Sequence, residues 1–369
     1  MRKCFCFLVL FLCGTGNMLV TGKETVQLTT RLSEILNVVE QESLYSTNPN
    51  KVFQNFIDTY LESYDIYAHY FPPKDFLLYK KSLEPEYSGI QMEIVPSKSG
   101  GFLCFPYPGG LAEHSGIKQG DLLVAVDGES VSEKNLYTVG SMIRGLTGAP
   151  LTLSVQPQNG SVHQITLVRR KSVAQSVKNI FCGSYKIYRI IRFTDSTPLE
   201  LKKILLTIPI QQPLILDLRG NFGGVLFSAI KSSELFLPKD VMIAGIRTKD
   251  DFIAYHSKNQ NPLLFKSIII LQDEQTASAA ELFIAALIQN KAAISFGKKT
   301  YGKGVTQKFI ELANGSALLL TYGKIVTPNN TTFNKKGLMP TISRTKNEQN
   351  DSTENNLIAF LDKLFSTTY

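Results

Sequence analysis

The sequence predicts an α/β core with a covered β-sheet and flanking helices, together with an inserted, mostly-β domain and an N-terminal helical segment. Three observations support this fold class. Continuous apolar runs at 214–218 and 267–271 alternate with helical patterns, and such runs form strands covered on both faces of a sheet. Short β-rich runs separated by glycine turns occupy residues 86–171. Before them, apolar residues recur at helical spacing.

The composition is that of a globular protein. Of the 369 residues, 43% are hydrophobic and 19% are charged, so a large core can be buried and global disorder is excluded. The net charge of +8 is spread thinly, without a block of five basic residues, so we expect no nucleic-acid partner. The histidines and cysteines match no metal-ligand spacing, and we expect neither a metal nor a cofactor.

The first 22 residues have the pattern of a secretory signal peptide. Arg2 and Lys3 precede an apolar run at 4–13 that is too short to span a bilayer comfortably, and small residues follow up to Gly22. We therefore expect export to the bacterial periplasm or another extracytoplasmic face. A buried N-terminal helix is the alternative, and whether the segment is cleaved or keeps the chain at a membrane stays open.

Three of the five cysteines lie in this predicted signal segment. The other two, Cys104 and Cys182, are too few for a disulfide framework, so we predict two separate buried thiols. A disulfide between them in an oxidising compartment is the alternative.

The predicted elements follow in order along the mature chain. The helical segment covers 23–85, with helical spacing at 26–39 and 52–61 on either side of Asn48-Pro49-Asn50. The mostly-β domain covers 86–171. It has expected strands at 90–95, 102–106, 122–126, 151–155 and 164–168, and a helix at 132–144.

The α/β core is expected over residues 172–345. Its expected strands are 185–192, 214–218, 267–271 and 294–297, and its expected helices are 199–207, 225–236 and 278–289. A polar tail over 346–369 ends in a short amphipathic helix at 355–365.

Three stretches of the core carry candidate chemistry, and each also has a purely structural interpretation. Glycines at 219–224 follow a buried strand, where they form either an oxyanion-binding corner or a plain tight turn. Ser278 stands where a loop enters a helix, as a nucleophile or as a helix cap. Lys303 stands between two glycines, which allow a buried general base as well as a surface lysine.

Together and in this order, the three stretches resemble the C-terminal processing peptidases, or tail-specific proteases, a family of PDZ-containing serine endopeptidases. The resemblance covers residues 30–342. Its motifs are Asp217-Leu-Arg-Gly-Asn-Phe-Gly-Gly224, Thr276-Ala-Ser-Ala-Ala-Glu281 and Tyr301-Gly-Lys-Gly-Val-Thr-Gln307, followed by 315–321, 325–328 and the closing Gly-Leu-Met-Pro340. Ala280 and Tyr301 depart from the usual serine and phenylalanine of these motifs.

The resemblance implies a serine-type endopeptidase that cleaves protein or peptide substrates near their C-termini. Ser278 is then the nucleophile, Lys303 the base and Gln307 the residue that orients the lysine amine. The implied oxyanion hole consists of the backbone N–H of Ala279 and one from the corner of Gly223 and Gly224.

The mostly-β domain resembles a PDZ domain, with Pro108–Asp121 and Leu122–Gly128 as its most diagnostic part. This implies that a substrate C-terminus adds a strand to the sheet edge. The implied contacts are Ser88, Gly89, Ile90, Met92, Val139, Met142 and Ile143. A spacer or an inhibitory plug is the alternative role of this domain.

Two competing interpretations remain. Ser228 and Lys231 match the Ser-x-x-Lys pattern of penicillin-recognising enzymes, but the companion motifs of that chemistry are absent. The alternative from another class is a non-catalytic, exported, peptide-binding scaffold with a protease-like domain. The physiological substrate, homo-oligomer formation and association with a membrane surface stay open.

Overall fold

The computed structural model describes residues 23–45, 48–84, 86–97, 99–171, 175–343 and 354–366. The predicted signal segment at 1–22 lies outside these residues. The chain forms two compact units, residues 1–59 and 60–369. Among the described helices, none combines the length and the apolar character needed to cross a membrane.

The first unit contains the two helices that the apolar spacing predicts. Helix α1 spans Lys23–Glu42, and α2 begins in this unit and spans Pro49–Glu62. Both are amphipathic, and apolar residues such as Ile35 and Phe53 are exposed by half or more of their surface. Several apolar side chains of both helices are therefore exposed, whereas Leu61 near the end of α2 is buried.

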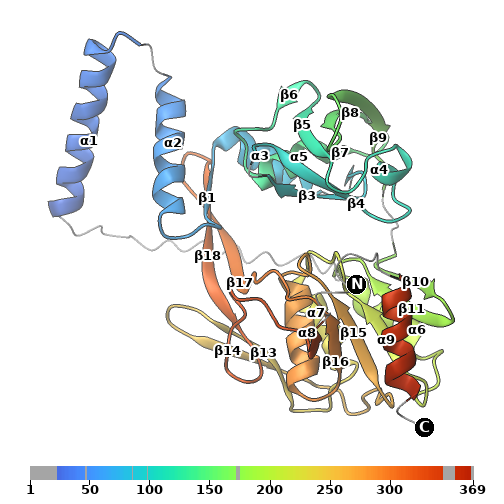
Figure 1. Ribbon diagram of the computed structural model, residues 1–369. Coiled ribbons are helices and arrows are strands. Elements are labelled where there is room, and N and C mark those ends of the chain that lie inside the picture. The colour runs from blue at the N-terminus through green and yellow to red at the C-terminus, as the bar shows by residue number, and fades with distance from the viewer. Residues whose placement is uncertain are drawn as a thin grey trace, which may run out of the picture. The chain divides into compact units, whose positions relative to one another are not determined.

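The mostly-β domain is built on one antiparallel sheet with strand order β3-β4-β5-β8-β9, as Figure 1 shows. Helix α5 is shorter than the predicted 132–144, because the Asn135 side chain caps its first turn by accepting a hydrogen bond from the Thr138 N–H. The elements of this domain are β2 (Tyr87–Ser88), β3 (Met92–Pro96), β4 (Phe102–Pro106), α4 (Leu111–His114), β5 (Leu122–Val126), β6 (Glu129–Ser130), α5 (Leu136–Ile143), β7 (Gly145–Leu146), β8 (Pro150–Gln156) and β9 (His163–Val168).

The α/β core contains the covered sheet that the continuous apolar runs predict. The strand order is β10-β11-β12-β15-β16-β19, with β10 antiparallel to β11 and the remaining pairs parallel. All four residues of β12 and all five of β15 are buried, as strands covered on both faces require. The strands are β10 (Val177–Cys182), β11 (Tyr185–Ile190), β12 (Leu214–Asp217), β15 (Ile268–Gln272), β16 (Ile294–Gly297) and β19 (Ile342–Ser343).

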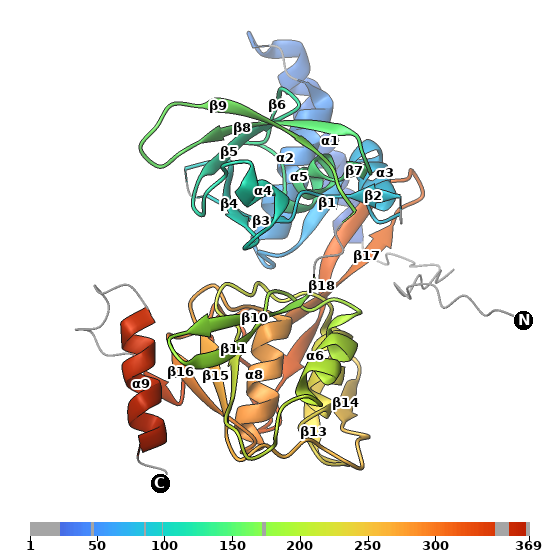
Figure 2. The same ribbon diagram turned by 90° about the vertical axis from the view of Figure 1, so that its right-hand side faces the viewer.

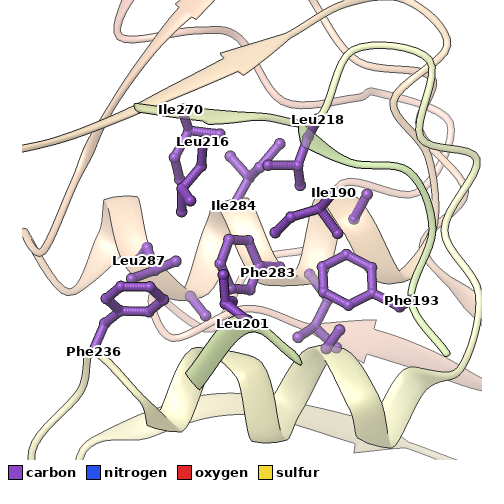
Figure 3. Packing of buried hydrophobic residues seen from close by; sticks show 14 of the residues in the cluster. Ile190, Phe193, Leu201, Leu216, Leu218, Phe236, Ile270, Phe283, Ile284 and Leu287 are labelled. Carbon is purple, nitrogen blue, oxygen red and sulfur yellow. The ribbon is translucent and has the colours of Figure 1, made fainter. Parts of the chain in front are cut away.

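Helices cover both faces of this sheet, as Figure 2 shows. On one face lie α6 (Thr197–Leu205), α7 (Leu226–Glu234) and α8 (Ala279–Gln289). Figure 3 shows Phe283 and Ile284 of α8 packed among side chains of the strands and of α6. On the other face lies α9 (Glu354–Ser366), which buries Leu357 and Leu361 against the strands. The C-terminal helix, predicted within a polar tail, thus packs against the core.

A second sheet was not predicted from the sequence. It joins β1 to β18, β18 to β13 and β17, and β13 to β14. Its strands are partly exposed, with four of the five residues of β14 facing solvent, so they lack a continuous apolar signal. The strands are β1 (His69–Phe71), β13 (Met242–Arg247), β14 (Phe252–His256), β17 (Val305–Glu311) and β18 (Ala317–Val326), and helix α3 (Pro73–Ser82) follows β1.

The two cysteines of the described chain lie in different hydrophobic clusters. Cys104 is buried in the core of the mostly-β domain, and Cys182 is buried beneath helix α9. No disulfide joins them, which confirms the prediction of two separate buried thiols.

Candidate active site

Two loops leave neighbouring parallel strands and run side by side across the carboxyl edge of the core sheet. The first follows β12 and leads to helix α7, and the second follows β15 and leads to α8. The Thr276 hydroxyl donates to the Leu218 carbonyl at 2.9 Å, and the Ala277 N–H donates to the Asn221 carbonyl at 2.9 Å. The topology of adjacent parallel strands therefore brings the glycine corner at 219–224 beside Ser278.

Ser278 precedes the first residue of α8 in a conformation that is rare for a residue with a side chain. Its φ is 59° and its ψ is −119°. Such strained backbone persists only where the surroundings fix it, and it clusters at functional sites. A Cβ on Gly223 would lie 2.8 Å from the Ser278 Cβ, so only glycine allows the two loops to approach this closely.

Two adjacent positive-φ residues of the glycine corner have N–H groups that differ. Gly223 has a φ of +101°, and its N–H donates to the Asn221 side-chain oxygen at 2.8 Å. Gly224 has a φ of +131°, and within the described chain its N–H has no protein partner. The Ala279 N–H belongs to the first turn of α8, where N–H groups have no partner within the helix. Of the predicted donors, Gly224 and Ala279 are thus available to a ligand.

Glu281 connects the serine loop to the lysine loop. It is fully buried, and its Oε2 accepts from the Ser278 N–H at 2.8 Å and from the Lys303 N–H at 2.9 Å. Its Oε1 accepts from the Thr300 hydroxyl at 2.5 Å and from the Gly302 N–H at 2.7 Å. Because Ser278 and Lys303 share one oxygen atom, their backbone nitrogens lie within the combined length of two hydrogen bonds.

The Lys303 side chain lies in a poorly solvated position. Burial lowers the pKa of its amine below the ordinary value, because a buried ammonium loses hydration. Its Nζ lies 5.2 Å from the centre of the Tyr67 ring. Among the described residues, no carboxylate forms an ion pair with it. This environment favours the neutral amine more than a surface position would.

The amide of Gln307 is held at both ends by other residues. Its Oε1 accepts from the Tyr137 hydroxyl at 3.0 Å, and its Nε2 donates to the Tyr67 carbonyl at 2.6 Å. Tyr137 belongs to helix α5 of the mostly-β domain, whereas Gln307 belongs to β17. Tyr67 therefore contacts both Lys303, through its ring, and Gln307, through its carbonyl.

Sequence reasoning did not single out Glu281 or Asn221 as functional residues. A glutamate three residues after a serine at a helix start is the capping-box pattern, which could have identified Glu281. Asn221 stands in the motif at 217–224, but the motif alone does not say what its side chain does. Its amide donates to the Ile190 carbonyl at 2.8 Å, and its oxygen holds Gly223, so its role depends on a distant strand.

A second candidate site lies in the mostly-β domain, where a cavity of ≈ 500 Å³ runs along β3 and α5. Strand β3 is the terminal strand of its sheet, so one edge of its backbone is unpaired within the described sheet. Four of the predicted contacts line this cavity, namely Gly89, Ile90, Met92 and Ile143. Three do not: Ser88 and Val139 are buried, and Met142 packs against the domain core.

The Ser-x-x-Lys match of Ser228 and Lys231 has a structural explanation. The Ser228 hydroxyl donates to the Thr194 carbonyl at 2.5 Å from a buried position, and Lys231 is exposed. His69 packs its ring against Tyr137, and burial lowers its pKa, with a further contribution from the charge of Lys303. Within the described residues, no cluster of histidine, cysteine or acidic side chains could hold a metal ion.

Comparisons with known proteins agree with this geometry. Residues 187–344 match peptidase family S41, and residues 106–157 match the PDZ domain family. A carboxyl-terminal-processing protease of Picosynechococcus sp. is 30% identical over 287 residues, which cover 75% of this chain and 69% of the relative. A probable CtpA-like serine protease of Staphylococcus haemolyticus is 29% identical over 298 residues, which cover 79% of this chain and 60% of the relative.

Among solved structures, the photosystem II D1 C-terminal processing protease aligns with a TM-score of 0.65 and 21% sequence identity. The alignment covers 84% of this chain and 86% of that structure, which shows a shared fold. The chain spans 60% and 64% of the length of the first two curated relatives that it matches, both from staphylococci.

Proposed function

Because this chain belongs to the carboxyl-terminal-processing proteases of peptidase family S41, we propose that Ser278 and Lys303 form the dyad of a serine endopeptidase that cleaves proteins near their C-termini. The observation that carries the proposal is the shared bonding of both residues to Glu281. A buried carboxylate that accepts from both loops fixes the nucleophile and the base relative to each other.

In this mechanism the Ser278 hydroxyl attacks the carbonyl carbon of the scissile peptide bond while Lys303 accepts its proton. The N–H groups of Ala279 and Gly224 stabilise the oxyanion that forms. Lys303 then gives the proton to the leaving amine, and an acyl-enzyme remains on Ser278. A water molecule, deprotonated by the same lysine, hydrolyses the ester and frees the enzyme.

The lysine must be neutral to accept a proton, and burial supports this requirement by lowering its pKa. Gln307 lies four residues further along the chain, and its amide is fixed by Tyr137 and by the Tyr67 carbonyl. We infer that Gln307 acts as a positioning residue, which keeps Tyr67 against the lysine side chain.

The PDZ domain supplies the second half of the proposal. The unpaired edge of β3 can accept a peptide as an additional strand, and the loop around Gly89 and Ile90 stands where a terminal carboxylate would bind. Leu136, Gly140 and Ile143 of α5 line the apolar side of the cavity. A substrate C-terminus bound there would raise the local concentration of the chain to be cut.

The test compares the full chain with its Ser278→Ala variant on an unfolded protein that has an apolar C-terminus. We expect cleavage by the first and none by the second, with fragments mapped by mass spectrometry. Ser228→Ala is the matched control, because it removes a helix serine from the same domain. Equal cleavage by the unmodified chain and the Ser278→Ala variant, or a loss that only Ser228→Ala causes, would exclude the dyad. Peptide binding without cleavage by any of them would support the scaffold alternative.

A further inference from the structure

A cavity of ≈ 440 Å³ opens at the carboxyl edge of the core sheet, and neither Ser278 nor Lys303 lines it. Residues that follow or end β11, β12, β15 and β16 form its floor. Its lining includes two arginines, a glycine and three apolar side chains of the core, namely Arg189, Arg219, Gly220, Phe222, Leu271 and Phe296.

Two arginines of this cavity converge on a single carboxylate. Asp217 is fully buried, and its Oδ2 accepts from Arg189 at 2.7 Å and from Arg219 at 2.8 Å. Burial alone would raise the pKa of Asp217, but the hydrogen bonds and charges of Arg219 and Arg189 hold it below the ordinary value. One negative charge thus faces two positive charges, and the charge of Asp273 acts on Arg219 as well.

The outer edges of both guanidinium groups remain available. Arg189 and Arg219 use Nε and Nη2 for Asp217, and within the described chain neither Nη1 has a hydrogen-bond partner. The two side chains are 26% and 30% exposed, so a ligand can reach them. Guanidinium N–H groups in this arrangement match the geometry of a carboxylate.

The other charged groups of the cavity are already satisfied. Lys298 and Glu274 form an ion pair at 3.0 Å. Asp273 accepts from the Gly220 N–H and from the Thr276 hydroxyl, both at 3.0 Å, and burial raises its pKa. The arginine pair thus keeps two unused Nη1 groups at the cavity, beside the negative charge that Asp273 places near Arg219.

The cavity has apolar as well as polar walls, and its floor leads to the glycine loop beside the serine. Phe222, Leu271 and Phe296 provide apolar surface beside the arginines. Phe222 directly precedes Gly223, whose Cα faces the Ser278 Cβ. The cavity thus lies at one end of the glycine loop and the proposed nucleophile at the other. A short extended peptide can follow this loop, with its last residue in the cavity.

We propose that this cavity binds the C-terminal residue of the tail that is cut off, with its α-carboxylate on Arg189 and Arg219 and its apolar side chain against Phe222. The proposal rests on the proposed peptidase function and names a substrate feature of that site. The core arginines then bind the chain end in a cavity whose wall is completed by residues 105–108 and Gln119 of the PDZ domain. An acidic side chain within the tail offers the same chemistry, and the test distinguishes the two sources.

The test is a double-mutant cycle with an alanine- and serine-rich decapeptide ending in valine, prepared as the free acid and as the C-terminal amide. Both peptides are measured with the unmodified chain and with Arg189→Gln. The substitution changes no residue of the PDZ domain. If the effects of Arg189→Gln and of replacing the acid by the amide are not additive, Arg189 therefore contacts the carboxylate. We expect the acid to exceed the amide in kcat/KM by about tenfold or more, and this preference to shrink by at least about threefold in the variant.

Two further variants keep the result interpretable. Lys186→Gln removes a positive charge from an exposed position of the same strand and should preserve the full preference. Arg189→Lys retains the charge beside Asp217 if Arg189→Gln fails to fold. One ammonium cannot serve Asp217 and a second carboxylate with the geometry of a guanidinium, so the preference should fall here as well.

The same cycle is measured as binding in the Ser278→Ala background, by fluorescence anisotropy. Binding does not require cleavage, so this readout stands even if the dyad assignment fails. Equal preference for the acid in the unmodified chain and the Arg189 variants would overturn the proposal and leave the PDZ domain as the reader of the chain end. A third peptide, with a C-terminal amide and glutamate in place of the last serine, tests the second source. Restored binding that depends on Arg189 would overturn the α-carboxylate assignment in favour of an acidic side chain.

Discussion

The peptidase core and the PDZ domain differ in how their polar groups are hydrogen-bonded. In the core, single buried carboxylates collect several donors: Glu281 accepts four hydrogen bonds, and Asp217 is held by two arginines. In the PDZ domain, the strand that borders the cavity is left unpaired along one edge. In the function proposed above, the core positions reacting groups in advance, whereas the PDZ domain keeps hydrogen bonds for a partner.

This difference predicts how each region responds to substitution. A fully bonded site loses its geometry when one buried acceptor or one glycine is changed, because unsatisfied buried groups are costly. A contact between the two regions should matter less, since it adjusts a site that the core has already built. Substitutions in both regions test this ranking, and the largest loss of activity is expected at the lysine.

Lys303→Met should abolish cleavage, with a loss in kcat/KM of about 10⁴-fold or more, because no other group is placed to accept the serine proton. The readout is cleavage of a fluorogenic peptide. Lys231→Met, which changes an exposed lysine of the same domain, should leave the rate unchanged. Activity retained in the Lys303 variant would mean that another residue is the base. The hydrogen bonds that Glu281 accepts would then contribute to stability alone.

The same lysine should give the protein a characteristic pH dependence. Its folded-state pKa is below the ordinary 10.5, so kcat/KM should rise about tenfold per pH unit until the amine is neutral. Between the folded and unfolded pKa values the unfolded chain binds more protons, so stability should also rise with pH in that window. Lys303→Met should remove this slope and raise the midpoint of thermal unfolding at neutral pH. If the pH dependence of stability persisted in Lys303→Met, another titrating group would be its cause.

Gly224→Ala should lower kcat by about 10³-fold, because it displaces a proposed oxyanion donor. A Cβ at this position would lie 2.1 Å from the Phe193 carbonyl oxygen, so the loop has to move. Gly148→Ala is the control, since Gly148 also has a positive φ but has open space around it. It should cost about 1 kcal/mol of stability from backbone strain alone and leave kcat unchanged. Equal losses of kcat in the two variants would remove Gly224 from the mechanism.

Glu281→Gln should lower kcat/KM by about 100-fold and the free energy of unfolding by about 2–4 kcal/mol. The amide presents N–H groups to two of the four donors in either orientation, so two buried donors lose their acceptor. Glu274→Gln changes an exposed glutamate with one lysine partner and should shift stability by less than about 0.5 kcal/mol. Chemical denaturation and peptide cleavage measure both effects. If Glu281→Gln changed neither kcat/KM nor the free energy of unfolding, Glu281 would not be the residue that holds the serine and lysine loops together.

Sequence reasoning predicted the parts of the molecule that depend on local pattern. The buried strands at 214–217 and 268–272 have continuous apolar runs, and the fold class follows from their alternation with helices. The second sheet was missed because strands such as β14 are exposed, and because β1 and β13 pair with β18, which is far away in the chain. The same limit applies at the site: Ser278, Lys303 and Asn221 stand in motifs, but the roles of Asn221 and Tyr137 depend on contacts with residues far away in the chain.

The smallest expected effect concerns the contact between the two regions. Tyr137→Phe removes the hydroxyl that donates to Gln307 and leaves the aromatic packing around Phe71 and Phe309 in place. We expect kcat to fall by about three- to tenfold, which corresponds to one hydrogen bond of about 1 kcal/mol, with little change in KM. Tyr322→Phe removes a more exposed hydroxyl on β18 and should have no effect. An unchanged kcat in Tyr137→Phe would show that the core holds Gln307 without help from the PDZ domain. A loss of kcat far above tenfold would show that the tyrosine hydroxyl is as important to the active site as the hydrogen bonds of Glu281.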